Sequence, residues 1–365
     1  MPVFTQYTFV LAALLQGAVA SPFKAVKATA STGAVPPVAA SVGSISNATL
    51  TQDWGITRDG GGGGTIDGTH IINFSDTGAK GGYFVSNSIA TTDTDGTTLT
   101  DYGTEYPLQQ WPLETDEKAP TGHRTAIWPN TNIVSGCNGT CGYTVANVID
   151  MSMTLPYDAQ NLYSTLAKIT LASNKTPSVE RIAPQFWKTD QINFGIYGLA
   201  NTRDGSGDIY MFAVTSSKGG MKVAKVAEAS IADTTKYTYW DGSTWATTAP
   251  SASDTTSEIF SNGDSGISTG DVFWSAYYGC WLAVFNDSMQ PDNTFRVMYS
   301  TTEELTGAWS TTSTTLFTTG GCKGCATPYN YATHAYPDVD STGKTLLLGW
   351  TFDGAYTQFA TVTWA

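Results

Sequence analysis

The feature that most constrains the fold of this chain is a weak internal repeat. Five segments each carry a turn, a short apolar run and a small polar pair, and their centres lie about 65–72 residues apart. A regular period of this length indicates that one supersecondary unit recurs along the chain. The segments are "DGTHIINFSDT" (67–77), "CGYTVANVIDMS" (141–152), "GSGDIYMFAVTSS" (205–217), "YYGCWLAVFNDS" (277–288) and "STGKTLLLGWTFD" (341–353).

Within each period, short strands are separated by turns rich in Gly, Asn, Asp and Ser, and helical periodicity is scarce. Three or four antiparallel strands per repeat are typical of a propeller blade. We therefore predict an all-β fold, a five-bladed β-propeller over residues 44–365. The early segment "SISNATLTQDW" is expected to pair with the last copy and close the ring, which covers an open sheet edge. A β-sandwich with an appended domain is the alternative.

The N-terminus predicts export. An apolar run over 9–15 precedes Ala18-Val19-Ala20, so residues 1–20 are interpreted as a signal peptide and the protein as extracellular. Residues 21–43 are rich in Ala, Val, Ser and Pro and are predicted to form a disordered leader or pro-segment. Asn73 begins a sequon inside an expected strand and is excluded. The predicted N-glycosylation sites are Asn47, Asn138, Asn174 and Asn286.

The chain has five cysteines. The pairs Cys137–Cys141 and Cys322–Cys325 each lie in a Gly-rich loop, and in a secreted chain this spacing favours local disulfides. Cys280 is left as a buried free thiol. Zinc needs four ligands, and the three histidines lie far from these loops in sequence. We predict no metal or cofactor, although the many acids leave a structural calcium ion open.

The charge balance limits the partners. A net charge of −13, with 13% charged residues, argues against nucleic acid and anionic membranes. Beyond the N-terminus, no stretch is long and apolar enough to cross a bilayer. The 11 Trp and 18 Tyr suit either a β-core or stacking on sugars. We expect a monomer whose partner is a polysaccharide or an oligosaccharide.

Paired carboxylates are the strongest catalytic signal. The chain has no G-x-S-x-G elbow and no phosphate-binding loop, and "NGDSGIST" lacks a suitable histidine partner. A hairpin at "IDGT" would bring Asp59 and Asp76 to one mouth, and glycosidases use two such acids. The glycines at 60–64 would let a sugar ring lie against the backbone. However, "TRDGSGD" at 202–208 repeats the pattern as a plain turn, so a structural role for both acids stays open.

Seven further residues are candidates for substrate binding. Arg58 is expected to hold a neighbouring carboxylate ionised, and Trp274 to offer a stacking platform, unless it belongs to the core. His123 and Arg124 precede Trp128 on an expected pocket strand, and His334 with Tyr336 precede the last apolar repeat. The full set is Arg58, His123, Arg124, Trp128, Trp274, His334 and Tyr336.

Five stretches of the chain together resemble a known family. They are "DGGGGGTIDGTHIINFSDT", "HRTAIWPNTNIV", "DVFWSAYYGCWLAVFND" with "VMYSTTEELTGAWS", and "ATHAYPDVDSTGKTLLLGWT". They are similar to secreted fungal members of the family called domain of unknown function 4185, related to glycoside hydrolase family 183 and other five-bladed propeller glycosidases. The resemblance implies hydrolysis of furanosidic arabinan by two aspartates, which map onto Asp59 and Asp76. Ser75 stands where the family usually has Gly.

These observations lead to one hypothesis and two rivals. We predict a secreted glycoside hydrolase that cleaves a furanose- or arabinose-containing cell-wall polysaccharide, with Asp59 and Asp76 as the catalytic pair. The first rival is a carbohydrate-binding propeller that does not cut. The second is a lyase or epimerase for uronic acids, which would need more basic groups than this acidic chain offers.

Overall fold

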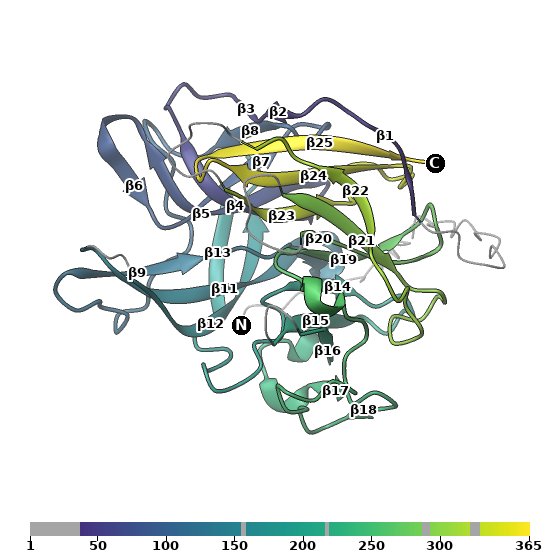
Figure 1. Cartoon of the computed structure of the whole chain (residues 1–365). Helices are drawn as coiled ribbons and strands as arrows, with labels where there is room; N and C mark the ends of the chain where they lie inside the picture. Colours follow the sequence, from purple (N-terminus) through teal and green to yellow (C-terminus); the bar gives the residue numbers. More distant parts are fainter. Residues whose placement is uncertain (1–36, 155–157, 216–218, 287–292, 322–328) are drawn as a thin grey trace, which may run out of the picture. The chain divides into compact units, whose positions relative to one another are not determined.

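The computed structural model describes residues 37–154, 158–215, 219–286, 293–321 and 329–365. Within these ranges the regular structure consists of β-strands and five short 3-10 turns, without an α-helix (Figure 1). None of the helical segments described is long and apolar enough to cross a membrane. The predicted signal peptide and the predicted Cys322–Cys325 disulfide lie outside the described residues.

The strands form five antiparallel sheets, here called blades 1 to 5. Blade 1 contains β4 (Thr57–Ile66), β5 (Thr69–Ala79), β6 (Tyr83–Val85), β7 (Ser88–Thr92), β8 (Thr98–Asp101) and β3 (Thr49–Leu50), which joins β8 in parallel. Blade 2 contains β9 (His123–Trp128), β10 (Val134–Gly136), β11 (Cys141–Ser152), β12 (Ala159–Leu171) and β13 (Pro177–Ala183). Blade 3 contains β14 (Gly198–Asn201), β15 (Asp208–Val214), β16 (Met221–Ala227), β17 (Thr238–Trp240) and β18 (Trp245–Ala246).

Blade 4 contains β19 (Gly270–Ser275), β20 (Cys280–Asn286), β21 (Thr294–Tyr299) and β22 (Thr314–Thr318). Blade 5 contains β23 (Asn330–Tyr336), β24 (Thr345–Phe352), β25 (Tyr356–Trp364), β1 (Ala39–Val42) and β2 (Ser46–Asn47). The 3-10 turns are η1 (Lys80–Gly82), η2 (Cys137–Gly139), η3 (Glu228–Ser230), η4 (Thr234–Lys236) and η5 (Gly263–Ser265).

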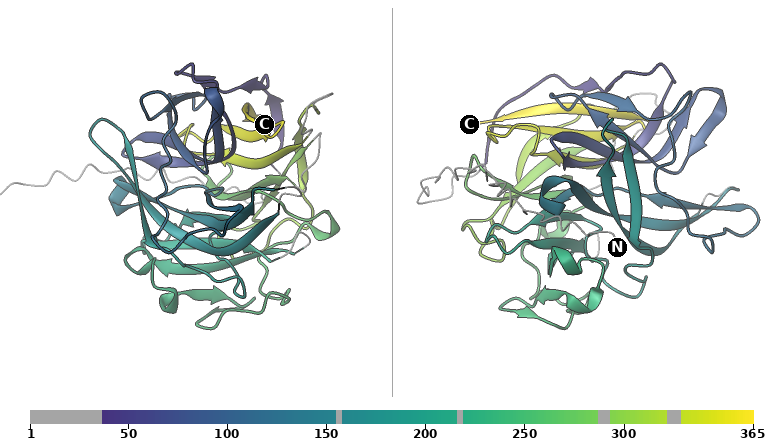
Figure 2. Two further views of the ribbon diagram at one scale, coloured as in Figure 1. Left: turned by 90° about the vertical axis from the view of Figure 1, so that its left-hand side faces the viewer. Right: turned by 180° about the vertical axis from the view of Figure 1, so that it is seen from behind.

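The innermost strands of the blades form a closed ring. They touch in the cycle β4, β10, β14, β19, β23 and again β4, and Figure 2 shows the sheets around this centre from two further sides. β4 and β23 run in the same direction, because Asp59 meets Tyr331 where both begin and Gly63 lies against Tyr336 further along. We call the end where these two strands begin the upper end. The predicted five-bladed β-propeller is confirmed, and each repeat segment carries the second strand of a blade.

The two ends of the described chain meet in blade 5. β1 and β2 both pair with β25, so Ala39 lies opposite Trp364 and Ser46 opposite Phe359. The predicted pairing of the "SISN" segment with the last copy is therefore confirmed. The predicted boundary of the leader is wrong at its end, because Ala39–Val42 is a strand of the fifth blade. A backbone that pairs with a sheet edge is ordered by those hydrogen bonds.

The five-glycine run lies in β4 and is buried. A Cβ on Gly62 would overlap the carbonyl oxygen of Thr131, and one on Gly64 that of Ile133. The Ile133 N–H donates to the carbonyl oxygen of Gly63 at 2.9 Å, which joins blades 1 and 2 through their backbones. The prediction that these glycines clear a surface for a sugar ring is therefore wrong. They let the innermost strands approach each other, a use that only glycine permits.

The exposed fractions of the sequon residues correct one glycosylation prediction. Asn286 is fully buried, and its side-chain oxygen accepts hydrogen bonds from the N–H and hydroxyl groups of Thr269. A glycan cannot be attached to such a side chain without unfolding blade 4, so Asn286 is removed from the set. Asn73 is also fully buried, as its exclusion requires. Asn47, Asn138 and Asn174 are exposed, and their glycosylation stays a prediction.

The close approach of the inner strands predicts a severe effect of one methyl group. Gly64→Ala should lower stability by at least about 3 kcal/mol, because its Cβ meets backbone that has no free rotamer to move away. Gly43→Ala is the matched control, since a Cβ there would meet its nearest described atom, the carbonyl oxygen of Thr361, at an ordinary contact distance of 3.4 Å. Thermal melting of both purified variants checks this. Equal melting temperatures for Gly64→Ala and the parent chain would contradict it.

Candidate active site

Asp59 lies at the upper end of the ring because of a bulge in β4. The register between β4 and β5 shifts between Arg58 and Gly60 and again between Gly60 and Gly62. Gly60 and Gly61 have φ values of 84° and 140°, which L-residues with a side chain rarely adopt. Bulges of this kind commonly re-aim a side chain next to an active site. Here the bulged residue is Asp59.

A second bulge brings Tyr331 to Asp59. The register between β23 and β24 shifts between Tyr331 and His334, and Ala332 between them has a positive φ of 52°. The Tyr331 hydroxyl donates to Oδ2 of Asp59 at 2.9 Å. Oδ1 of Asp59 is shielded from solvent, and no side chain or backbone group of the described residues lies within hydrogen-bond geometry of it. Two irregular strand segments from blades 5 and 1 thus present one carboxyl group to the upper end.

Asp76 lies on β5, and its side chain is held by blade 2. Arg124 donates to Oδ2 at 2.5 Å and Trp128 Nε1 donates to Oδ1 at 2.9 Å, so both carboxylate oxygens accept a hydrogen bond. Arg124 is itself held by the Ser86 hydroxyl at 2.8 Å and lies over the ring of Phe84. The Asp76 side chain is 24% exposed, so the carboxylate still faces solvent.

The environments of the two acids differ in charge and in hydration. Burial, followed by the negative charge of Asp76, raises the pKa of Asp59 to about 7, although the Tyr331 hydroxyl and the charge of Arg124 act in the opposite direction. Asp76, by contrast, lies beside the guanidinium group of Arg124 and is partly exposed to solvent. Near neutral pH, the Asp59 carboxyl group can therefore carry a proton. Such a pair can donate a proton on one side and supply negative charge on the other.

Arg58 does not belong to this site, and its assignment to substrate binding is wrong. Its guanidinium group is buried and donates two hydrogen bonds of 2.8 Å to the carboxylate of Asp101. It also lies 4.1 Å from the ring centroid of Phe74. Side chains alternate across a strand, so Arg58 points into blade 1 while the neighbouring Asp59 points to the ring.

His334 and Tyr336 are also buried, with 1% and 2% of their surface exposed, so their assignment as a pocket lip is wrong. His334 joins three blades through Asp271 Oδ2 at 3.1 Å and Asn130 Oδ1 at 3.4 Å. The hydroxyl of Tyr336 donates to the carbonyl oxygen of Gly61, and its ring fills the space beside Gly63. Both residues hold the ring together beneath the two acids.

His123 and Trp274 lie apart from the acid pair, against expectation. His123 precedes Arg124 on β9 and points to the opposite face, where its Nδ1 lies 2.8 Å from Asp150. Trp274 is near the end of β19, at the lower end of the ring, and lines a cleft of about 290 Å³ with Asn201 and Asp338. The guanidinium carbon of Arg203 lies 3.2 Å from the centroid of the Trp274 ring, which covers one of its faces.

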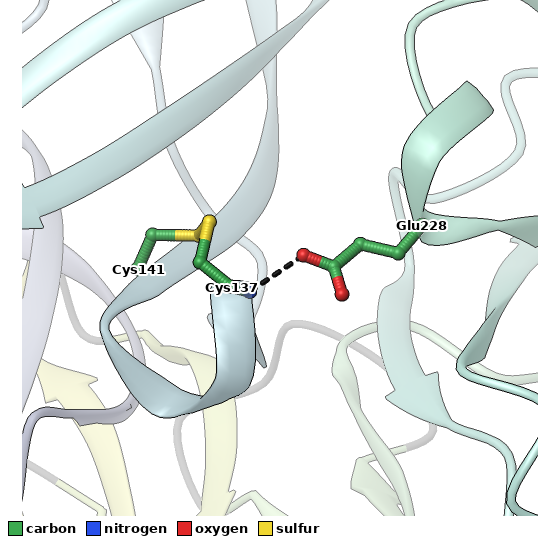
Figure 3. Close-up of side chains that lie close together, drawn as sticks. All are labelled: Cys137, Cys141 and Glu228. Atoms are coloured by element: carbon green, nitrogen blue, oxygen red, sulfur yellow. Dashed lines mark hydrogen bonds between the residues drawn. A yellow bond between two sulfur atoms is a disulfide. The ribbon is translucent and has the colours of Figure 1, made fainter. Parts of the chain in front are cut away.

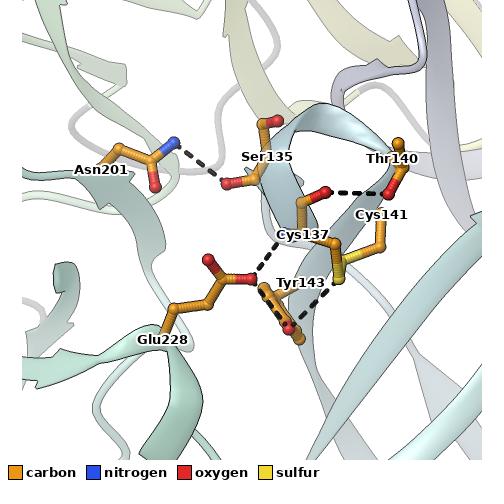
Figure 4. Close-up of a disulfide and its surroundings, with 7 residues drawn as sticks. All are labelled: Ser135, Cys137, Thr140, Cys141, Tyr143, Asn201 and Glu228. Atoms are coloured by element: carbon orange, nitrogen blue, oxygen red, sulfur yellow. Dashed lines mark hydrogen bonds between the residues drawn. A yellow bond between two sulfur atoms is a disulfide. The ribbon is translucent and has the colours of Figure 1, made fainter. Parts of the chain in front are cut away.

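Among the described residues, the cysteine, histidine and acidic side chains form one group of the size that could bind a metal ion: Cys137, Cys141 and Glu228 (Figure 3). The structure confirms the predicted Cys137–Cys141 disulfide, and a disulfide sulfur lacks the thiolate charge that ligation needs. Glu228 instead accepts from the Cys137 N–H at 2.5 Å and from the Tyr143 hydroxyl at 3.2 Å (Figure 4). The group clamps blade 2 to blade 3. Cys280 is a buried free thiol, as predicted.

A structural calcium ion finds little support in the described side chains. Ca²⁺ takes six to eight oxygen ligands. The buried acid of the ring, Asp271, already accepts through Oδ2 from the Ala335 N–H at 2.8 Å, and only its Oδ1 lacks a partner. With Oδ1 of Asp59, the acids of the ring leave two unpaired carboxylate oxygens among the described residues, fewer than the ligand set of a calcium ion.

Tyr331 is the contact that sequence reasoning missed. The sequence singles out "THAYPD" two residues further on, because histidine in an apolar context is conspicuous. The bulge at Ala332 directs Tyr331 towards Asp59. This bulge cannot be predicted from the sequence, because an alanine gives no sign that its φ is positive. Ser86 is likewise an ordinary loop serine whose value is its 2.8 Å contact with Arg124.

The raised pKa of Asp59 predicts how stability changes with pH. Between about pH 4 and pH 7 the unfolded chain loses the Asp59 proton while the folded chain keeps it, so the free energy of unfolding falls as the pH rises. Asp59→Asn removes this loss. A pKa raised from 3.8 to about 7 corresponds to about 4 kcal/mol, so the melting temperature of Asp59→Asn relative to the parent should increase by about 6 °C between pH 4 and pH 8. Asp95→Asn, at an exposed acid, should show no such trend, and a flat difference for Asp59→Asn would contradict the assignment.

Several solved structures share the general arrangement of this chain. An exo-β-1,3-galactanase from Phanerochaete chrysosporium has 10% identity and a TM-score of 0.48, and the match covers 89% of this chain and 64% of the galactanase. A family 117 glycoside hydrolase from Zobellia galactanivorans has 10% identity, a TM-score of 0.46 and coverage of 90% and 91%. An endo-arabinase from Bacteroides thetaiotaomicron has 11% identity, a TM-score of 0.43 and coverage of 88% and 98%.

A search of the curated proteins found no match. A family model does match: that of "Domain of unknown function (DUF4185)", over residues 153–360. The match covers more than half of the 365 residues and runs from blade 2 to blade 5. This chain therefore belongs to the DUF4185 family.

Proposed function

We propose that this protein is a secreted glycoside hydrolase that uses Asp59 and Asp76 as its catalytic pair. The observation that carries the proposal is the contrast between two neighbouring carboxyl groups. Burial and the charge of Asp76 raise the pKa of Asp59 to about 7, whereas Asp76 is partly exposed and accepts hydrogen bonds from Arg124 and Trp128. Glycoside hydrolysis needs one carboxylic acid and one carboxylate at the same bond.

The roles follow from this contrast. Asp59 donates its proton to the glycosidic oxygen, so that the leaving sugar departs as an alcohol and the bond electrons stay on that oxygen. Asp76 supplies the negative charge that faces the oxocarbenium-like centre, and either attacks it or directs a water molecule to it. Tyr331 keeps the Asp59 carboxyl group in place, and Arg124 does the same for Asp76. Arg124 and Trp128 are thus positioning residues in this proposal.

The substrate class rests on the resemblance rather than on the site. We propose a furanosidic or arabinose-containing cell-wall polysaccharide. An extracellular location, a fungal source, a relation to glycoside hydrolase family 183, a monomeric state and glycans on the exposed sequons belong to the same proposal. The acidic surface, at a net charge of −13, supports a neutral glycan over an anionic one.

One observation favours a carbohydrate-binding protein that does not cut. Both oxygens of Asp76 accept hydrogen bonds, from Arg124 and Trp128, which leaves the carboxylate less free to attack a sugar. In this second candidate function the acids bind hydroxyl groups only. The lyase or epimerase alternative gains no support, since Arg124 is the basic group in contact with the acid pair among the described residues.

Replacing either acid separates the two functions. Asp59→Asn and Asp76→Asn should each lower kcat on arabinan by at least about 100-fold, because each removes a proton donor or a charge needed in the transition state. Product analysis on arabinan, arabinogalactan and fungal wall glycans measures this. Asp95→Asn is the control and should keep full activity. Full activity in either active-site variant would refute the pair, and binding without products from the parent protein would favour the second function.

Tyr331→Phe tests whether Asp59 is the residue that donates the proton, because the Tyr331 hydroxyl affects the pKa of Asp59. The Tyr331 hydroxyl favours the ionised form of Asp59, so its removal should raise the pKa of Asp59 further. If Asp59 is the acid, activity falls as the pH rises through about 7, and this alkaline limb should move to higher pH in the variant. A profile of kcat/KM against pH measures the shift. An unmoved alkaline limb, or one displaced to lower pH, would show that Tyr331 does not act through Asp59.

A further inference from the structure

We propose that a cleft over blade 3 holds a neutral stretch of the glycan chain at a distance from the bond that is cut. The cleft has a volume of about 740 Å³, and it lies between the loop at 187–196 and the loop at 249–252. This volume is within the range of about 300–1,000 Å³ in which proteins hold small ligands. The inference rests on the proposed function, because it extends the same substrate site.

The cleft opens at the same end of the ring as the acid pair. The loop at 187–196 leads directly into β14, and β14 runs beside β10, as two contacts in the same order show: Asn132 bonds Leu199, and Ser135 bonds Asn201. β10 in turn follows β4, since Gly62 faces Thr131 and Gly64 faces Ile133. The start of β14 therefore lies at the upper end, with Asp59. A polymer bound over Asp59 can continue towards blade 3 without passing around the molecule.

The lining suits a neutral sugar. Its apolar lining includes the half-buried side chains of Ile192, Ile196 and Val214, and the buried rings of Phe194 and Tyr239 lie beneath them. Its walls carry hydroxyl, amide and carboxyl groups from Thr189, Gln191 and Asp190. Apolar floors with a few convergent polar groups are typical of ligand sites. No lysine or arginine is among the described lining residues, and the carboxylate of Asp190 would repel a uronic acid, so the chemistry favours an uncharged glycan.

The walls are fixed before any ligand arrives. Trp187 Nε1 donates to the carbonyl oxygen of Phe194 at 2.9 Å, and Gln191 Oε1 accepts from the Lys188 N–H at 3.0 Å. On the other wall, the Thr215 hydroxyl donates to the carbonyl oxygen of Ala252 at 2.9 Å. A preformed cleft orders little on binding and therefore loses little affinity to conformational entropy.

Two serines of the same loop give a matched pair of variants. Ser251 lines the cleft, whereas Ser253 is outside its lining, and both are exposed. Ser251→Trp should fill the cleft, while Ser253→Trp adds the same bulk beside it. Both variants are made in the full chain that carries Asp59→Asn, and their retention is measured by gel electrophoresis in soluble arabinan, arabinogalactan, mannan or polygalacturonate.

We expect the parent and Ser253→Trp to be retained by at least one neutral polymer and not by polygalacturonate. Ser251→Trp should bind that polymer about tenfold more weakly. In chains with Asp59 intact, the ratio of kcat/KM on polymer to that on a short oligosaccharide should fall by the same factor only for Ser251→Trp. Three outcomes would refute glycan binding in the cleft. They are equal retention of the two tryptophan variants, retention on polygalacturonate alone, and no retention of the parent.

The binding and hydrolysis measurements also distinguish this inference from the proposed function. Weaker binding by Ser251→Trp, together with no hydrolysis by the parent chain, would support glycan binding in the cleft and refute the proposed hydrolase. Hydrolysis that requires Asp59 but is unchanged in Ser251→Trp would support the proposed hydrolase and refute glycan binding in the cleft.

Discussion

The structure depends on how closely β4 approaches its neighbours. Gly62 and Gly64 lie against the backbone of Thr131 and Ile133, and Gly63 against the ring of Tyr336. A side chain at any of these positions would push the innermost strands apart and widen the ring. The same strand carries Asp59 on the bulge just before this contact. The contact that sets the width of the ring therefore also sets the height at which the acid sits.

The residues of the candidate site come from three neighbouring blades. Blade 1 supplies both carboxyl groups on one hairpin, and blades 2 and 5 supply the groups that make them different. Arg124 and Trp128 reach Asp76 from blade 2, and Tyr331 reaches Asp59 from blade 5. Beneath them, His334 and Asp271 join blades 5 and 4 with almost no exposed surface. The polar residues at the centre thus serve two purposes, chemistry at the upper end and cohesion below it.

The sequence predicted what depends on local order and missed what depends on contacts between blades. The repeat was sufficient to predict the five blades. The Asp67-Gly68 turn, in which both residues have positive φ, was sufficient to predict the β4–β5 hairpin. The roles of Arg58 and His334 were wrong because their partners, Asp101 and Asp271, lie 43 and 63 residues away. Asn286 was misread because a sequon does not report burial. Tyr331 was missed because it lies 272 residues from Asp59 and depends on a bulge.

The pairing of β1 with β25 has a consequence for biosynthesis. The strand that completes blade 5 is made near the beginning of the chain, and its partner is made near the end, with Ala39 opposite Trp364. Pairings of such high contact order form slowly, since the intervening chain must first be gathered. During synthesis the edge of β24 and β1 both lack β25, and unpaired edges invite association with other chains. Premature termination before residue 356 would therefore yield a propeller with one open side, the kind of species that chaperones and proteases of the cell have to remove.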